Sequence, residues 1–283
     1  MDPNTAEAFW RALSEHYAAH GRHDMAWRLP GPDGRYDPYR ILISEIMLQQ
    51  TQVARVTPKF HDFIAAFPDV LALAAAPLGD VLKLWSGLGY NRRAKYLWQA
   101  ARAAVDNYGG QFPLTLDGLQ RLPGVGPNTA GAVMAYAYDQ PVVYVETNIR
   151  TVIIHHFFAD QTDVPDSAIK DVMAELVTKS VAMSSGADGL TPREFYWAMM
   201  DYGTFLKKTV GNLNRASRSY TRQSAFQGSL RQLRGAVMRL LSERAYDRAQ
   251  LVAALADERS AEVLLALTAE GLVVRDGEVV RLA

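Results

Sequence analysis

Apolar residues recur at helical spacing along most of the chain. Residues 6–19 place Phe9, Leu13 and Tyr17 on one face, which predicts an amphipathic first helix. Prolines and glycines punctuate residues 23–39 and predict a loop. Residues 39–53 are strongly apolar and resume the helical period, so a second helix is expected there.

The same periodicity predicts a run of further helices separated by proline and glycine. Their expected ranges are 58–67, 70–75, 78–85, 94–108, 129–138, 150–158, 166–183 and 191–206. Residues 184–189 are predicted to be a flexible link. The helix after this link should begin with a capping box, because Thr191 precedes Pro192 at the first helical position and Glu194 at the third.

The pattern changes again from about residue 228. Helices are predicted at 229–244, 247–255 and 260–270, followed by two short β-branched runs around an Asp276-Gly277 turn, which is typical of a β-hairpin. Three helices and a hairpin are the order of a winged-helix module. Such modules bind DNA or other proteins, and the order of elements does not say which.

A glycine-rich turn at residues 122–131 is the motif around which the chain is organised. Gly124 and Gly126 can adopt positive φ, and Pro127 suits the first turn of a helix. Unpaired N–H groups at such a helix start offer a site to an anion such as phosphate. About twenty residues later comes one acidic residue, Glu146. The alternative is that the turn is purely structural.

A second carboxylate and an aromatic residue are further candidates. Glu45 sits inside the apolar run 39–53, where partial desolvation would raise its pKa and let it donate a proton near neutral pH; the alternative places it on the wet face of the helix. Tyr90 lies beside two glycines and is followed by basic residues, as an aromatic that enters a base stack would be. An aromatic residue in this position can instead cap a core.

The amino-acid composition excludes several kinds of functional site. The 283 residues include no cysteine, which excludes disulfides, thiolate zinc sites, iron–sulfur ligation and cysteine nucleophiles. The charges balance, with 30 basic and 30 acidic residues, but residues 205–248 hold ten Lys or Arg against two acidic residues. This stretch is a candidate phosphate-facing surface, or a solvated helix face. No secretory leader or membrane span is recognised, so we expect a cytoplasmic monomer, associated with the nucleoid if the source is bacterial.

Three motifs in order resemble the helix-hairpin-helix (HhH-GPD) DNA glycosylases, in particular the MutY-type adenine glycosylases. They are Glu45 with residues 47–53 (MLQQTQV), residues 84–90 (LWSGLGY), and residues 122–130 (LPGVGPNTA). The resemblance covers roughly residues 20–205. It implies an all-α, two-lobed fold that binds double-stranded DNA and rotates one nucleotide into a pocket. We expect this domain to span residues 1–227 and a winged-helix-like α+β module to span 228–283.

The resemblance also implies roles for individual residues. Glu45 would protonate the departing base and help position water, and Glu146 would stabilise the positive charge that develops on the sugar. We assign Asn148 to the catalytic group, and Trp27 and Arg28 to the base pocket. An alkali-metal ion is expected on hairpin carbonyls near Leu122 and Val125. The residues expected to contact DNA are Gln49, Gln50, Thr51, Tyr90, Gly124, Gly126, Asn128, Thr129, Arg215, Arg218 and Arg222.

The chain departs from the family pattern in four places. The acid after the hairpin is usually Asp, whereas here it is Glu146. Asn128 replaces the Lys of lyase-type relatives and the Tyr common in adenine-removing relatives, so base removal without strand cleavage is expected. The cysteines of the usual iron–sulfur loop are replaced by the basic loop 207–227, so no cofactor is expected. Nothing resembles the domain that reads oxidised guanine.

The sequence therefore predicts a monofunctional, cofactor-free DNA glycosylase. Its expected substrate is adenine in a mismatch with guanine or opposite 8-oxoguanine. Two alternatives remain open. One is the same chemistry on another base, such as uracil or thymine opposite guanine, hypoxanthine or a modified base. The other is a DNA-binding homologue without catalysis, in which Glu146 would be an inactivating substitution.

Overall fold

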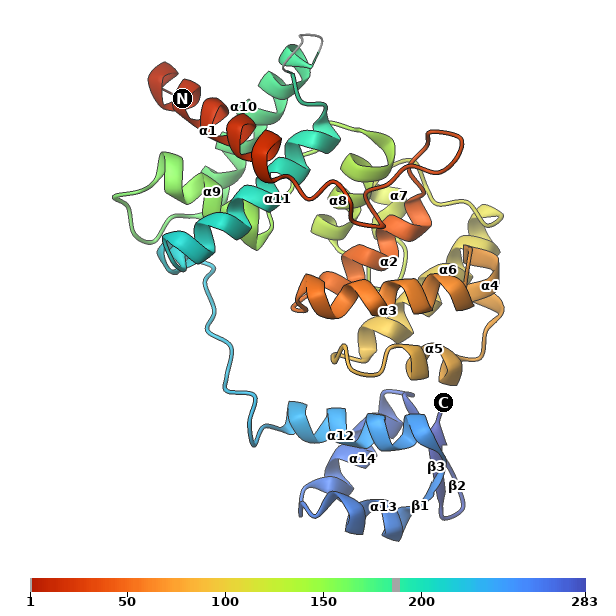
Figure 1. Ribbon diagram of the computed structural model, residues 1–283. Helices are drawn as coiled ribbons and strands as arrows, with labels where there is room; N and C mark the ends of the chain where they lie inside the picture. Colours follow the sequence, from red (N-terminus) through yellow and green to blue (C-terminus); the bar gives the residue numbers. More distant parts are fainter. Residues whose placement is uncertain (1, 185–188) are drawn as a thin grey trace. The chain divides into compact units, whose positions relative to one another are not determined.

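The computed structural model describes residues 2–184 and 189–283, so most of the predicted link at 184–189 lies outside the described residues. The described chain is mainly helical, with three short strands near its C-terminus (Figure 1). The helical body with a small strand-containing C-terminal module is as predicted. The helices are α1 (Pro3–His20), α2 (Pro38–Leu48), α3 (Val53–Ala66), α4 (Val70–Ala75), α5 (Leu78–Leu84), α6 (Arg92–Tyr108), α7 (Leu116–Gln120), α8 (Pro127–Tyr138), α9 (Thr147–Phe157), α10 (Asp166–Met183), α11 (Pro192–Thr209), the 3-10 helix η1 (Leu213–Ala216), α12 (Leu230–Glu243), α13 (Arg248–Leu255) and α14 (Ser260–Ala269).

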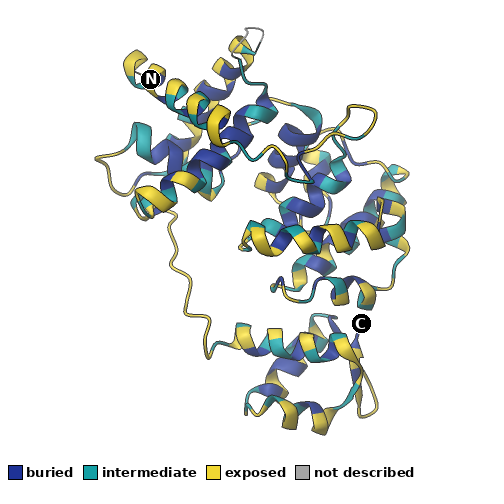
Figure 2. Cartoon of the chain, viewed as in Figure 1, coloured by how far each residue is buried: buried dark blue, intermediate teal, exposed yellow. Residues whose placement is uncertain are grey.

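The chain divides into two compact units. The first unit contains Met1–Ile41, Leu114–Leu116 and Gly126–Arg222, and the second contains Leu42–Pro113, Asp117–Val125 and Gln223–Ala283. Each unit buries its own apolar faces, seen as dark blue sides of helices in Figure 2. The proposed boundary between residues 227 and 228 stays a prediction.

Helix α11 is the centre of the first unit and packs against α1, α8, α9 and α10. Its start carries the predicted capping box, with the Thr191 hydroxyl accepting from the Glu194 N–H and the Glu194 carboxylate accepting from the Thr191 N–H. Phe195 and Tyr196 are fully buried within the unit. Gly203 leaves no room for a Cβ against the backbone of Asn148 in α9, so the two helices approach closely at this point.

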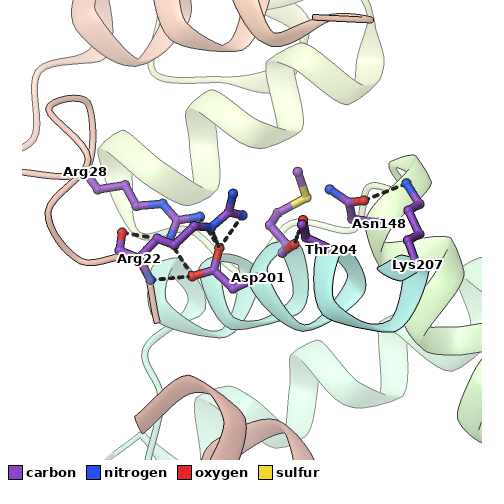
Figure 3. A network of polar contacts seen from close by, with 7 residues as sticks. Arg22, Arg28, Asn148, Asp201, Thr204 and Lys207 are labelled. Atoms are coloured by element: carbon purple, nitrogen blue, oxygen red, sulfur yellow. Dashed lines mark hydrogen bonds and ion pairs between the residues drawn. The ribbon is translucent and has the colours of Figure 1, made fainter. Parts of the chain in front are cut away.

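A buried carboxylate ties the loop after α1 to α11. Asp201 is bound by Arg28, whose two terminal nitrogens each donate over 2.9 Å, and by Arg22, whose Nε donates over 2.7 Å (Figure 3). Burial alone would raise the pKa of Asp201, but the hydrogen bonds and charges of the two arginines lower it below its usual value. Removing Asp201 would leave the buried guanidinium group of Arg28 without its carboxylate, which costs about 3–5 kcal/mol.

The helical part of the second unit is built around aromatic side chains. Phe63 packs edge-on against Trp85, at a ring separation of 6.0 Å, and both are fully buried. The predicted start of a helix at Pro58 was wrong, because α3 begins at Val53 and carries Pro58 inside it. The predicted second helix was too long at its end, since α2 stops at Leu48 and residues 49–52 form a turn.

The C-terminal module contains the predicted helices and hairpin. Strands β2 (Val273–Asp276) and β3 (Val279–Leu282) pair antiparallel around the Asp-Gly turn. A two-residue strand, β1 (Tyr246–Asp247), adds to the other edge of β3 and gives the sheet order β1-β3-β2. Sequence periodicity missed β1 because two residues carry no alternating pattern. Among the described residues, no helix combines the length and apolar character needed to cross a membrane.

Candidate nucleic-acid interface and active site

The glycine turn before α8 forms as predicted, with one exception. The Val125 N–H donates to the Leu122 carbonyl (3.1 Å), and Gly124 has a φ of +75°. A Cβ on Gly124 would lie 2.5 Å from the Cβ of Tyr96, so only glycine fits. Gly126, which could also have adopted positive φ, has a φ of −83° and is the N-cap of α8. The space beside Gly126 is open, since a Cβ built there would have no other atom within 4 Å.

Helix α8 begins with Pro127 in its first turn and has no side-chain cap, as a helix start that offers N–H groups to an anion would. Thr129 is buried in this first turn. The side chain of Asn128 donates to the carbonyl of Val145 over 3.0 Å. Asn128 therefore links the start of α8 to the residue before Glu146, and contact of its side chain with DNA stays a prediction.

Glu146 is the N-cap residue of α9 and is partly buried. Desolvation by the surrounding protein raises the pKa of its carboxyl group, and the charge of Lys207 counteracts this rise. An acid that is partly shielded from water and whose charge is supported by one cation is suited to stabilise a developing positive charge.

Lys207, in the last turn of α11, is the site residue that the sequence did not identify. Its Nζ donates to Oδ1 of Asn148 over 2.7 Å (Figure 3). Burial lowers the pKa of Lys207, and Glu146 raises it again. The sequence grouped Lys207 with the basic loop. A useful signal would have been its spacing from Gly203, because residues four apart lie on the same face of a helix.

A cavity of about 540 Å³ lies beside this group in the first unit. It is open to solvent and has mainly polar side chains. Its lining residues are Thr147, Arg150, Lys207, Asn212, Asn214, Ser219, Tyr220 and Thr221. The cavity thus connects the start of α9 with the cysteine-free basic loop.

The basic loop is fastened to its surroundings and is less irregular than predicted. It contains η1, and Val164 pairs with Ser217 in a parallel β-bridge. Buried Asn214 donates to the hydroxyl of Thr151 over 2.9 Å. Arg150 of α9 bonds both Asp166 and Ser217. These contacts hold the loop through side chains of α9 and the start of α10.

The three arginines predicted to bind DNA from this loop are not equivalent. Arg218 is exposed, but it forms an ion pair with Asp163 at 2.7 Å. Arg215 and Arg222 are exposed. The charge of Arg218 is therefore largely neutralised by Asp163. The predicted base-pocket residues Trp27 and Arg28 are buried, and the guanidinium group of Arg28 is occupied by Asp201.

Glu45 lies in the part of α2 that belongs to the second unit and is partly buried between the buried residues Ser44 and Ile46. It is therefore neither fully buried nor on a fully wet face. Glu146 belongs to the first unit, and the convergence of the two acids stays a prediction.

Two exposed residues predicted to enter the duplex share a strained backbone conformation. Gln50 has a φ of +54° and Tyr90 a φ of +49°, in the left-handed region that disfavours residues other than glycine. Such positions cost on the order of 1–3 kcal/mol and persist where neighbouring structure fixes them. No local signal predicts this conformation at Gln50, because neither neighbour is glycine or proline.

Arg93 is the residue that fixes both strained turns. One terminal nitrogen bonds the end of α2, and the other bonds the turn before α6. Burial lowers the pKa of Arg93 to about 10, which still leaves the group charged at neutral pH. Its acceptors are the carbonyls of Ile46 (2.6 Å), Met47 (3.0 Å), Gln49 (2.7 Å), Leu88 (3.3 Å) and Gly89 (3.0 Å), and the Thr51 hydroxyl (3.2 Å).

Thr51 also contributes to the hydrogen-bond network around Arg93. Its hydroxyl lies 3.2 Å from the carbonyl of Gln49 and 3.4 Å from that of Leu88. The structure thus brings together Gln49, Gln50, Thr51 and Tyr90 within the second unit. It brings Asn128, Glu146 and Asn148 together within the first.

Comparison with known proteins agrees with this geometry. Residues 43–178 match the family described as HhH-GPD superfamily base excision DNA repair protein. The chain therefore contains an HhH-GPD domain, which spans just under half of its length. The matched residues include the turn after α2, the Tyr90 turn, the hairpin and Glu146.

Curated relatives of this HhH-GPD chain are named adenine DNA glycosylase. The relative from Buchnera aphidicola is 30% identical over 233 residues, which is 79% of this chain and 61% of the relative. The relative from Mycolicibacterium smegmatis is 43% identical over 134 residues, which is 47% of this chain and 44% of the relative. The chain thus spans less than two thirds of the length of either relative.

A solved structure titled as a thermostable thymine-DNA glycosylase is similar to this HhH-GPD chain in both fold and sequence. The TM-score is 0.56 and the identity 25%, over 71% of this chain and 86% of that one. The helical glycosylase fold predicted from the three motifs is therefore confirmed.

Proposed function

We propose that this protein is a monofunctional DNA glycosylase that removes adenine mispaired with guanine or 8-oxoguanine from duplex DNA. In this reaction the bond between the sugar C1′ and N9 of adenine breaks. The bonding electrons leave with the base, which takes up a proton, and water adds to C1′ with loss of its proton. Glu45 is assigned the proton transfer to the base and Glu146 the stabilisation of the oxocarbenium-like sugar.

The observation that carries this proposal is the position of Glu146. It is the first residue before α9, it is joined to the hairpin helix through the Asn128–Val145 hydrogen bond, and its charge is supported by Lys207. A contact between the hairpin and a DNA phosphate would thus fix where the carboxylate lies relative to the adjoining sugar. Double-stranded DNA is the proposed partner, and the protein is proposed to act as a monomer without a cofactor.

The absence of strand cleavage is part of the proposal. Asn128 carries an amide where lyase-type relatives have an amine, so it cannot form a Schiff base. Lys207 is an amine beside Glu146, and borohydride trapping on abasic DNA tests whether it reacts. We expect no trapped complex. A complex that disappears in K207M would show that Lys207 serves as a lyase nucleophile.

A single-turnover assay tests the main proposal. Duplexes carrying adenine opposite guanine, 8-oxoguanine, cytosine or thymine are incubated with excess protein and then treated with alkali to reveal abasic sites. E45Q and E146Q should each reduce excision by at least about a hundredfold, the scale on which acid catalysis contributes. Both should still bind a duplex with a tetrahydrofuran abasic analogue. E7Q, at an exposed position of α1, is the control. Wild-type protein that binds but excises nothing would favour the inactive homologue.

A second candidate is removal of thymine or uracil opposite guanine. It is favoured by the likeness to the thymine-DNA glycosylase structure, which covers 86% of that chain. The same assay decides between the two, with duplexes containing thymine or uracil opposite guanine added. Faster excision of either pyrimidine than of adenine would replace the first assignment by the second.

A further inference from the structure

Within the second unit, the C-terminal module packs beside the turns that present Gln50 and Tyr90. Lys95 of α6 donates to the carbonyl of Glu270 over 2.6 Å, and Arg234 of α12 forms an ion pair with the carboxylate of Glu270 at 2.5 Å. At the other end of the module, a Cβ on Gly79 would lie 2.8 Å from the carbonyl oxygen of Ala283. Contacts at both ends give α12 a defined position on this unit.

This docking places two donors from the C-terminal segment against the strained turns. Arg231 donates to the Tyr90 hydroxyl over 2.9 Å. Gln223 donates to Oε1 of Gln50 over 2.9 Å and also bonds the Tyr90 hydroxyl. The guanidinium group of Arg231 also lies over the rings of Tyr90 and Phe226, at 5.8 and 5.4 Å from their centroids. The four polar groups therefore satisfy one another while DNA is absent.

A cavity of about 420 Å³ lies at this junction. Its wall combines aromatic rings, side-chain amides and guanidinium groups, the groups that stack on a nucleobase and donate to its edge. Residues of α12 contribute one side of the wall. The principal side chains are Gln49, Gln50, Tyr90, Tyr96, Arg231 and Arg234.

We infer that α12 reads the base left unpaired in the strand opposite the excised nucleotide, and that Arg231 selects guanine there. Guanine presents two adjacent acceptors, O6 and N7, and arginine binds this pair with two parallel hydrogen bonds. Cytosine presents an amino donor on the corresponding edge, which repels a guanidinium group. Arg234 is engaged by the charged Glu270, whereas the two terminal nitrogens of Arg231 bond neutral acceptors, the Tyr90 hydroxyl and the Ser224 carbonyl (3.2 Å), which a base can displace. The inference rests on the proposed glycosylase function.

The test is equilibrium binding of the full chain to duplexes that carry a tetrahydrofuran abasic analogue opposite guanine, 8-oxoguanine, cytosine or thymine. Such duplexes cannot be cleaved, so the result does not depend on which base the enzyme excises. Wild-type protein should bind the guanine duplex more tightly than the cytosine duplex, and more tightly than the 8-oxoguanine duplex, because 8-oxoguanine carries a hydrogen at N7 and cannot accept there. R231A should reduce the ratio of guanine to cytosine affinity by roughly tenfold, the discrimination expected of one bidentate contact.

Two further variants make the test specific. R231K keeps the charge without the two-pronged geometry, so it should lose discrimination while keeping most of the affinity. R239A removes the same charge from an exposed position of α12 and should leave the ratio unchanged. Equal weakening on all four duplexes by R231A would show a backbone contact and overturn the inference. Tighter binding of all four by R231A would show that Arg231 only blocks Tyr90, and would overturn it as well.

Discussion

Two turns and one loop of this protein are held by arginine, and the arginines differ in what they bond. Arg93 holds the Gln50 and Tyr90 turns through five carbonyls and one hydroxyl. Arg150 and Arg218 hold the basic loop through aspartates, Asp166 and Asp163. Carbonyls satisfy the donors of a guanidinium group and leave its charge in place, whereas an aspartate cancels that charge. The number of basic residues in a segment is therefore a poor guide to the positive charge it offers to DNA.

The largest expected effect comes from removing Arg93. R93M leaves several carbonyls without a donor and releases two strained turns, so the free energy of unfolding should fall by about 2–4 kcal/mol. Chemical denaturation measures it. R92M, at the neighbouring position whose side chain is 63% exposed, should change stability by less than about 0.5 kcal/mol. Equal stability of R93M and wild type would show that the turns do not depend on this arginine.

A smaller loss is expected where the basic loop is held by a neutral hydrogen bond. N214A removes the buried bond to Thr151, which should cost about 1–2 kcal/mol. Because the bond anchors the loop locally, limited proteolysis should cut residues 217–222 faster in this variant, with N107A at an exposed position of α6 as the control. Unchanged proteolysis would assign the anchoring to Arg150 and the β-bridge alone.

The third prediction concerns Lys207, whose positive charge stabilises the ionised form of Glu146. Burial raises the pKa of Glu146 and Lys207 opposes this, so K207M should raise that pKa further. Excision needs the ionised carboxylate, so the acid limb of the rate profile should move to higher pH. The rate should fall more at acidic than at neutral pH. K208M, at an exposed neighbouring position, should leave the limb in place. An unmoved limb in K207M would separate the acid from this lysine.

The smallest expected effect comes from single arginines of the basic loop, and it compares the exposed Arg222 with Arg218, which is paired with Asp163. R222A should reduce the slope of log affinity against log salt by about one, as expected for loss of one phosphate contact. R218A should change it less, because Asp163 already pairs with Arg218. D163N frees Arg218 and should steepen the slope. Identical slopes for R218A and R222A would show that the ion pair opens on DNA.

Local sequence signals identified the elements that depend on local chemistry. The glycines and proline at 124–127 predicted a turn and a helix start, the Thr191 capping box predicted the start of α11, and the Asp-Gly pair predicted the β2–β3 hairpin. In each, the residue type is required by its own backbone conformation. The positive φ of Gly124 shows this directly.

Features that depend on distant residues were not predictable in this way. Gln50 adopts a left-handed conformation because Arg93, more than forty positions later, bonds the Gln49 carbonyl before it and the Thr51 hydroxyl after it. Lys207 supports Glu146 because α11 packs on α9, which no local pattern reveals. For the same reason the sequence assigned Arg28 to a pocket and did not foresee its bond to Asp201. The site residues were recognised by type, and their supporting partners required coordinates.

Gly203 carries a consequence for how the acidity of this site can be adjusted. Because a side chain at this position would collide with the backbone of Asn148, the spacing between α11 and α9 is set by an absence of atoms. Lys207 follows one turn later on α11, so the same spacing determines how far its ammonium group lies from the carboxylate. Replacing Gly203 with alanine would push α11 away from α9. This would weaken the effect of Lys207 on the pKa of Glu146 without changing any charged residue.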